Sequence, residues 1–255
     1  MRQRNSYSRI VQELEDWQHL SKGLKIQLFQ HCIENNITSF FINFSNPAFY
    51  DRELGTALSE SQLSRDEIQL IANLRTKDSG EHDIVSEVEQ ILEILKTDYL
   101  DLIFIDGKNA SEEKVSALGL LQSRGKLKET GVSNLKNEQD PEWNFPLPCK
   151  ARLSSLTFNR GSIKSLTLEK PTSKEISKML FLESTGEENQ NEHLEAMSQK
   201  YGLLPKELLF AWLLEHPGHL HPIIKGKSEA VIDSAAKALN TRLIKEDRLK
   251  LPDLI

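Results

Sequence analysis

The run Lys225-Gly226-Lys227-Ser228 combines residue types that can bind an anion. It follows the apolar residues Pro222 to Ile224 and precedes a segment with helical periodicity. The backbone N–H groups in the first turn of a helix have no partner within the helix, so they can be offered to a phosphate together with the hydroxyl and the two ammonium groups. A Ser in this place can instead cap the helix without any ligand. The run therefore predicts a phosphate site, with helix capping as the alternative.

Three histidines near the carboxyl end raise the question of a metal site. His216, His219 and His221 are close in sequence, but Pro217-Gly218 interrupts the helix between them. They therefore do not share the fixed helical face that ligands at positions i and i+4 need. The 2 cysteines lie far apart, outside any CxxC or Cys/His cluster, which argues against structural zinc and a disulfide framework. We expect no metal in this protein.

Predicted strands and predicted helices alternate along the whole chain. Apolar residues recur at helical spacing between short apolar or β-branched runs, as Ile84, Val88, Ile91 and Leu95 do. Eight of the short runs are predicted strands: 9–12, 39–45, 67–74, 101–106, 130–133, 151–158, 178–183 and 221–225.

Repeated strand and helix units predict a parallel sheet with helices outside it, and this number of units in 255 residues is the size of a (β/α)8 TIM barrel. We expect one barrel domain over residues 1–255. A doubly wound open sheet is the alternative, but no GxGxxG follows the first strand. The segments 137–148 and 160–177 do not fit the pattern, so we expect one or more shortened βα units between residues 158 and 178.

Charge and hydropathy exclude several classes of partner. The chain has 32 basic and 38 acidic side chains, a net charge of −6, and the basic residues are scattered, so we expect no nucleic-acid binding. No apolar run approaches the roughly 20 residues of a membrane span, and the first residues lack the apolar core of a signal peptide. We expect a cytoplasmic protein without a membrane partner. Its expected ligand is a small molecule or nucleotide in the barrel mouth. The sequence does not identify a protein partner.

Several motifs together resemble a known family. The segment TDYLDLIFI at 97–105 is followed by GVSN at 131–134, and ELGTAL at 53–58 and AWLLEHP at 211–217 agree with the same pattern. This combination resembles the aldo-keto reductase family over nearly the full chain. The pair Asp16-Trp17 is similar to the bacterial oxidoreductase branch of that family.

The resemblance implies a barrel that binds NADP(H) in extended form and reduces carbonyls. The implied catalytic groups are a Tyr that donates the proton, an Asp and a Lys that tune it, and a His beside the carbonyl. The four matching positions in this sequence hold Asn46, Phe41, Asn73 and Asp106. Loss of a general acid costs about 10²- to 10⁴-fold in rate, and loss of an electrostatic donor about 10²- to 10³-fold. We therefore predict a catalytically degenerate member, in which Asp106 would repel a developing alkoxide.

The cofactor positions implied by the resemblance are better preserved. Ser133 and Asn134 stand where the family reaches the nicotinamide carboxamide, Phe181 where it stacks on the ring, and the Lys225 to Ser228 loop where it holds the adenosine phosphates. The assigned positions are Ser133, Asn134, Phe181, Lys225, Gly226, Lys227 and Ser228. Ala151 and Leu182 stand where the family has Gln and Ser. The sequence leaves open whether NADP(H) binding is retained, weakened or lost.

Three functional hypotheses follow. The first is a non-catalytic barrel that senses a ligand or binds a partner. The second is an NADP(H)-dependent oxidoreductase acting on small carbonyl compounds, with Tyr50 or Asp106 as the altered proton-transfer group. The third is another reaction on the same scaffold, such as hydrolysis with Asp106, which no second carboxylate or metal set supports.

Overall fold

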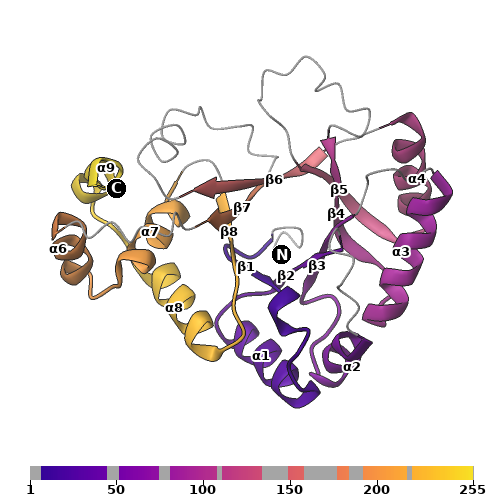
Figure 1. The fold of residues 1–255 in the computed structure, drawn as a ribbon, viewed down its shortest axis with the longest axis horizontal. Helices are drawn as coiled ribbons and strands as arrows, with labels where there is room; N and C mark the ends of the chain where they lie inside the picture. The colour runs from indigo at the N-terminus through magenta and orange to yellow at the C-terminus, as the bar shows by residue number, and fades with distance from the viewer. Residues whose placement is uncertain are drawn as a thin grey trace.

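A computed structural model shows a closed parallel β-barrel with helices outside it (Figure 1). It describes residues 7–44, 52–74, 81–107, 111–133, 149–157, 177–183, 192–216 and 220–254. Within these residues, neighbouring strands in the barrel are neighbours in sequence, and the last strand pairs with the first. The strands are β1 (Val11–Glu13), β2 (Ser39–Asn43), β3 (Gln69–Asn73), β4 (Leu100–Asp106), β5 (Leu127–Ser133), β6 (Cys149–Thr157), β7 (Ser177–Glu183) and β8 (Leu220–Ile224). The predicted (β/α)8 barrel is confirmed, and the open-sheet alternative is wrong.

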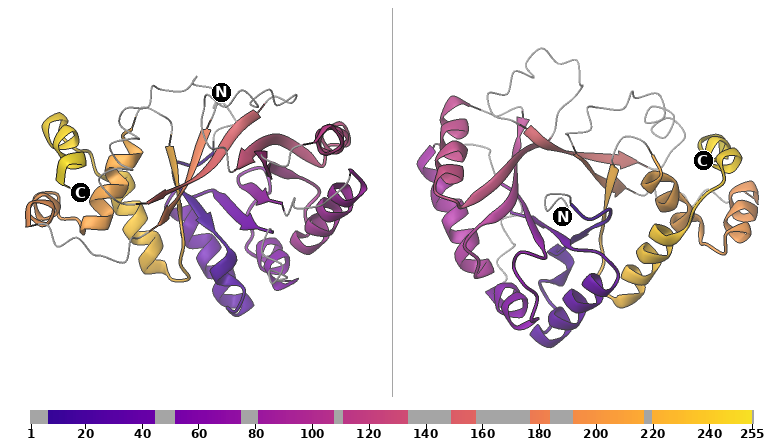
Figure 2. Two further views of the ribbon diagram at one scale, coloured as in Figure 1. Left: turned by 45° about the horizontal axis from the view of Figure 1, so that its top comes forward. Right: turned by 180° about the vertical axis from the view of Figure 1, so that it is seen from behind.

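Helices surround much of the barrel wall, and α6 and α9 lie beyond α7 at the outer edge in both views of Figure 2. The helices are η1 (Glu15–Trp17), α1 (Lys22–Glu34), α2 (Arg52–Glu60), α3 (Glu81–Leu95), α4 (Glu112–Ser123), α6 (Glu192–Lys200), α7 (Pro205–Leu214), α8 (Glu229–Asn240) and α9 (Lys245–Leu254). None of these described helices is long and apolar enough to cross a membrane. The expected shortening between 158 and 178 falls mostly on residues outside the described ranges, as does the segment 137–148.

Alternation along the strands creates two apolar layers. On β2, Phe40 and Ile42 pack outward against the helices, whereas Phe41 packs inside the barrel. The interior cluster comprises Tyr7, Val11, Phe41, Ile71, Leu102, Phe104, Ala151, Leu153, Met179 and Ile223. Side chains therefore fill the barrel, so a ligand must bind at the strand ends or outside the wall.

The segment TDYLDLIFI at 97–105, one of the motifs that carry the family resemblance, has a structural role at the start of β4. The carboxylate of Asp101 accepts hydrogen bonds from the backbone N–H of Leu70 at 2.9 Å, from Arg65 at 2.7 Å and from Lys128 at 2.9 Å. The cations of Arg65 and Lys128 lie 3.8 and 4.1 Å from the ring centre of Tyr99. These contacts tie β3, β4 and β5 together and satisfy a carboxylate that is nearly buried.

Candidate functional site

The carboxyl ends of the strands form one end of the barrel, which we call the barrel mouth. Residues two positions beyond the interior cluster keep the same inward direction because side chains alternate along a strand. The mouth residues defined in this way are Glu13, Asn43, Asn73, Asp106, Phe181 and Lys225. Ser133 joins them as the direct register partner of Asp106. Four of the predicted site positions, Asn73, Asp106, Ser133 and Phe181, are thus brought to the same end, together with the first residue of the predicted phosphate loop. Asn46, Tyr50 and Asn134 lie outside the described residues.

An aromatic floor closes the bottom of the mouth. Phe41 is fully buried, and its ring meets that of Phe181 edge to face, with centroids 5.1 Å apart and planes at 84°. The ring of Phe104 also lies near Phe41, with 6.4 Å between the centroids. The position that the family resemblance assigns to a catalytic Asp is therefore apolar and packed. Phe181, assigned to stacking on a cofactor ring, already contacts a neighbour within the protein.

A pair of neutral amides occupies the place where the family resemblance implies a lysine. The Nδ2 of Asn73 donates a hydrogen bond to Oδ1 of Asn43 at 3.1 Å. The Oδ1 of Asn73 is buried and accepts no hydrogen bond from the described residues. An amide carries no charge, so this pair supplies no cation to lower the pKa of a neighbouring acid.

Asp106 and Ser133 face the mouth from adjacent strands. They are direct partners in the β4–β5 register, and Asp106 is half-buried. The hydroxyl of Ser133 donates to the backbone carbonyl of Ile105 at 3.3 Å. Ser133 lies at the mouth, and this hydrogen bond already occupies its proton.

One pair of mouth residues was not predicted from the sequence. The Nζ of Lys225 lies 3.4 Å from Oε2 of Glu13, whose side chain is 2% exposed, and 4.9 Å from the centre of the Phe181 ring. The other carboxylate oxygen of Glu13, Oε1, is buried and has no hydrogen-bond partner among the described residues. Burial raises the pKa of Glu13 to about 7, with Lys225 opposing the rise and Glu15 adding to it. The first strand was expected over 9–12, but it ends at Glu13. The prediction therefore did not place Glu13 at the carboxyl end of a strand.

The loop from Lys225 to Ser228 has a fixed backbone. Gly226 has a φ of 144°, and a Cβ on it would lie 2.8 Å from Cγ2 of Val231, so a larger residue would be strained. Its carbonyl accepts hydrogen bonds from Nε1 of Trp17 at 2.9 Å and from Nε2 of Gln12 at 3.3 Å. Ser228 is the N-cap residue of α8, but its side chain makes no capping hydrogen bond. The capping alternative for this hydroxyl is therefore wrong in this structure.

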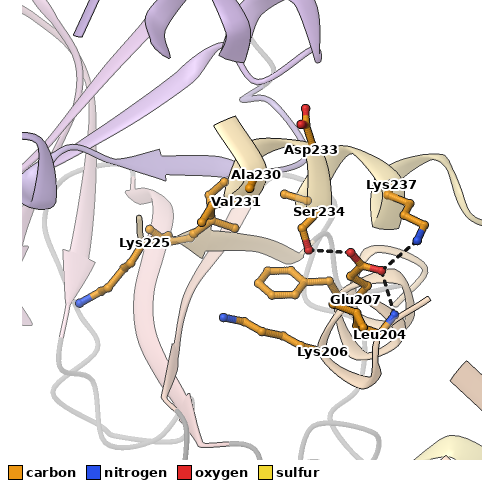
Figure 3. A pocket seen from close by; sticks show the side chains of 13 residues that line it. Leu204, Lys206, Glu207, Lys225, Ala230, Val231, Asp233, Ser234 and Lys237 are labelled. Atoms are coloured by element: carbon orange, nitrogen blue, oxygen red, sulfur yellow. Dashed lines mark hydrogen bonds and ion pairs between the residues drawn. The ribbon is translucent and has the colours of Figure 1, made fainter. Parts of the chain in front are cut away.

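A cavity of about 530 Å³ lies beside the loop, between α7 and α8 (Figure 3). Its lining includes the apolar residues Phe210, Ile224 and Val231 and the cations Lys206 and Lys225. Its volume lies within the range of small-molecule sites.

One side of this cavity is held by an ordered carboxylate. Glu207 accepts hydrogen bonds from the hydroxyl of Ser234 and the backbone N–H of Leu204, both at 2.8 Å, and pairs with Lys237 at 3.4 Å. In Figure 3 the side chain of Lys225 extends away from this cluster. Lys225 thus lines both the cavity and the barrel mouth.

The histidines do not assemble a metal site in the described part of the chain. His221 is buried, and its Nδ1 lies 2.8 Å from the backbone carbonyl of Ser8. His216 packs near the ring of Trp212 at 5.9 Å, and His219 is outside the described ranges. Within those ranges, no group of three or more His, Cys, Asp or Glu side chains is arranged to hold a metal ion.

The fold and the mouth define a (β/α)8-barrel protein whose predicted phosphate loop follows its last strand. The family model described as "Aldo/keto reductase family" matches residues 14–141, half of the chain. The chain belongs to the aldo/keto reductase family, a family of oxidoreductases.

Individual relatives and structures agree with this assignment. The chain is 26% identical to the "Uncharacterized oxidoreductase YcsN" of Bacillus subtilis, covering 93% of this chain and 90% of the relative. It is 25% identical to the 6-dehydroglucose reductase of Agrobacterium fabrum, covering 78% and 76%. An aldo/keto reductase from Klebsiella pneumoniae, solved with NADP and acetate, superposes with a TM-score of 0.76 at 21% identity, covering 96% of this chain and 89% of that one.

Proposed function

We propose that this protein is a catalytically degenerate aldo/keto reductase that binds a phosphorylated nucleotide without reducing carbonyls. Its role is then to sense that ligand or to present the liganded barrel to a partner. The observation that carries the proposal is the packing of Phe41 against Phe181, at the two positions assigned to the catalytic Asp and to the ring that stacks on nicotinamide.

The nicotinamide end of an NADP(H) molecule does not fit the mouth as it stands. Phe41 covers part of the Phe181 ring, and the ammonium of Lys225 lies against that ring as well. The nearly buried carboxylate of Glu13 adds negative charge beside them. Neither Phe41 nor Asn73 can supply the proton or the positive charge that carbonyl reduction requires.

The adenosine phosphate end fits better. The α8 N-terminus offers the backbone N–H groups of its first turn, a hydroxyl that the helix does not use, and the exposed side chains of Lys225 and Lys227. The neighbouring cavity has apolar residues such as Phe210 and Ile224 in its wall, beside the acids Glu207 and Asp233, and it has the volume for a nucleoside. These residues support binding of the phosphates at the loop and of the base in the cavity. NADP is present in the related Klebsiella structure, which makes it the natural first ligand to test.

Titration with NADP+, NADPH and adenosine 2′,5′-bisphosphate tests this function. We expect saturable binding of all three ligands, measured by tryptophan fluorescence and by thermal shift. Their affinities should be similar because the nicotinamide half adds little binding energy. We also expect no NADPH oxidation when small aldehydes and ketones are added. Absence of saturable binding for all three would reject the nucleotide site.

The alternative function is an NADP(H)-dependent oxidoreductase with a different proton donor. Asp106 favours it, because its side chain lies at the mouth. Carbonyl-dependent oxidation of NADPH by the unmodified protein, abolished by Asp106→Asn, would establish this alternative and reject the degenerate function.

A further inference from the structure

The ion pair of Glu13 and Lys225 links the first strand to the proposed nucleotide site. Glu13 ends β1 and points into the mouth, whereas Lys225 begins the phosphate loop after β8. The carboxylate of Glu13 is nearly buried, but the ammonium-bearing side chain of Lys225 is 56% exposed. The lysine can therefore turn toward a ligand, and the glutamate cannot follow it into solvent.

The surroundings of Glu13 make its charge depend on Lys225. Among the described residues, Lys225 is the cation that faces it, from the end of β8, and Glu15 and Asp16 of η1 add negative charge. Strand β2 presents Phe41, the direct partner of Glu13 in the strand register, and β7 presents Phe181. Without Lys225, an ionised Glu13 would be a buried charge beside two other acids, which is strongly unfavourable.

We propose that Lys225 is shared between Glu13 and the phosphate of a bound nucleotide, so that nucleotide binding takes up a proton at Glu13. This inference rests on the proposed function, because it assigns a regulation to the same site. When the phosphate draws Lys225 away, the carboxylate gains a proton and becomes neutral. The protonated carboxyl can also donate a hydrogen bond, which its unpaired Oε1 does not make now. Nucleotide affinity is then coupled to pH near neutrality.

The sign of this coupling is opposite to that of an ordinary phosphate site. A phosphate monoester loses its second proton near about pH 6, so its attraction to cations strengthens as pH rises. Burial raises the pKa of Glu13 to about 7. Protonated Glu13, the form that releases Lys225, therefore becomes scarce above that pH. The fraction of protonated Glu13 falls by about tenfold between about pH 6 and about pH 8.

Calorimetric titration with NADP+ tests the inference. On the unmodified protein at about pH 8, titrations in two buffers with different ionisation enthalpies should show uptake approaching about one proton per nucleotide. Glu13→Gln should bind NADP+ about tenfold more tightly than the unmodified protein at about pH 8 and about equally at about pH 6. The proton count needs no variant, so it stands even if a variant does not fold.

Two further variants complete the test. Lys225→Gln should weaken binding and remove the uptake attributed to Glu13, whereas Asp16→Asn, which removes an exposed acid nearby, should keep it. Equal pH dependence in the unmodified protein and in Glu13→Gln, or no proton uptake, would overturn the inference while leaving nucleotide binding intact. No binding by either protein at any pH would reject the proposed function and the inference together.

Discussion

Phe41 and Phe181 meet edge to face in the barrel mouth, with 5.1 Å between their ring centres. They belong to strands that are not neighbours in the barrel, so the contact crosses its interior. The Phe41 side chain is fully buried. Phe41, at the position that the family resemblance assigns to a catalytic Asp, is thus part of the packed interior of the barrel.

Truncation of this ring should cost stability and open the mouth. We expect Phe41→Ala to lower the free energy of unfolding by about 3 to 5 kcal/mol, measured by urea denaturation. Phe40→Ala is the matched control, because Phe40 is equally buried on the same strand but faces the helices. Both variants should lose comparable stability, but only Phe41→Ala should raise the affinity for NADP+ relative to adenosine 2′,5′-bisphosphate. An identical affinity ratio in both would show that Phe41 does not obstruct the nicotinamide end.

Restoring the family's catalytic residues should create activity. A variant combining Phe41→Asp, Asn46→Tyr, Asn73→Lys and Asp106→His is expected to oxidise NADPH with a small aldehyde at least about 10²-fold faster than the unmodified protein. The measurement is the loss of NADPH absorbance, with NADPH binding confirmed separately. A folded variant that binds NADPH and stays inactive would contradict the assignment of these four positions.

The carboxyl of Glu13 should make stability depend on pH. Burial raises its pKa from 4.5 to about 7 in the folded protein, so the folded state holds this proton more tightly than the unfolded state. Its stabilising effect is present below about pH 4.5 and is lost as pH rises to about 7, a change of about 2 to 3 kcal/mol.

Glu13→Gln should remove this loss. The variant's free energy of unfolding should fall less than that of the unmodified protein between about pH 5 and about pH 8, as followed by urea denaturation. Parallel pH profiles for the two proteins would show that Glu13 has an ordinary pKa.

The proposed phosphate loop should not tolerate a side chain at Gly226. We expect Gly226→Ala to lower stability by about 1 to 3 kcal/mol because of its φ of 144° and the contact with Val231, and to weaken NADP+ binding. Gly23→Ala is the control, because a Cβ there meets nothing within 4 Å and Gly23 lies in α1. Alanine favours a helix, so this variant should be at least as stable as the unmodified protein. Unchanged NADP+ affinity in Gly226→Ala would separate the loop from the nucleotide site.

Most of the barrel could be predicted because its strands are short apolar runs with clear boundaries. The runs at 39–45 and 67–74 contain β2 and β3; β2 is shorter than its run at the carboxyl end, and β3 is shorter at both ends. Helix α9 was not predicted, since it carries Pro252 internally and exposes Leu249 to solvent, which obscures an amphipathic pattern. Helix α2 was recognised only as a family motif at 53–58, without a helix assignment.

The positions of several candidate residues at strand ends could be predicted from the sequence, but their contacts could not. Asn73, Asp106 and Ser133 end their strands as expected, because a strand's last residue can be read from where the apolar run stops. The Glu13–Lys225 pair joins opposite ends of the sequence and depends on β1 pairing with β8. The contact between Phe41 and Phe181 likewise depends on how strands face one another across the interior, which no local pattern records.

The pairing of Val11 with Ile223 closes the barrel between its first and last strands. During synthesis on the ribosome, β1 emerges well before β8, its second neighbour in the barrel. Its unpaired edge, and the apolar surface beneath it, are then open to association with other nascent chains. Production of this protein should therefore be sensitive to chaperone supply and to the rate of translation, independently of how stable the finished barrel is.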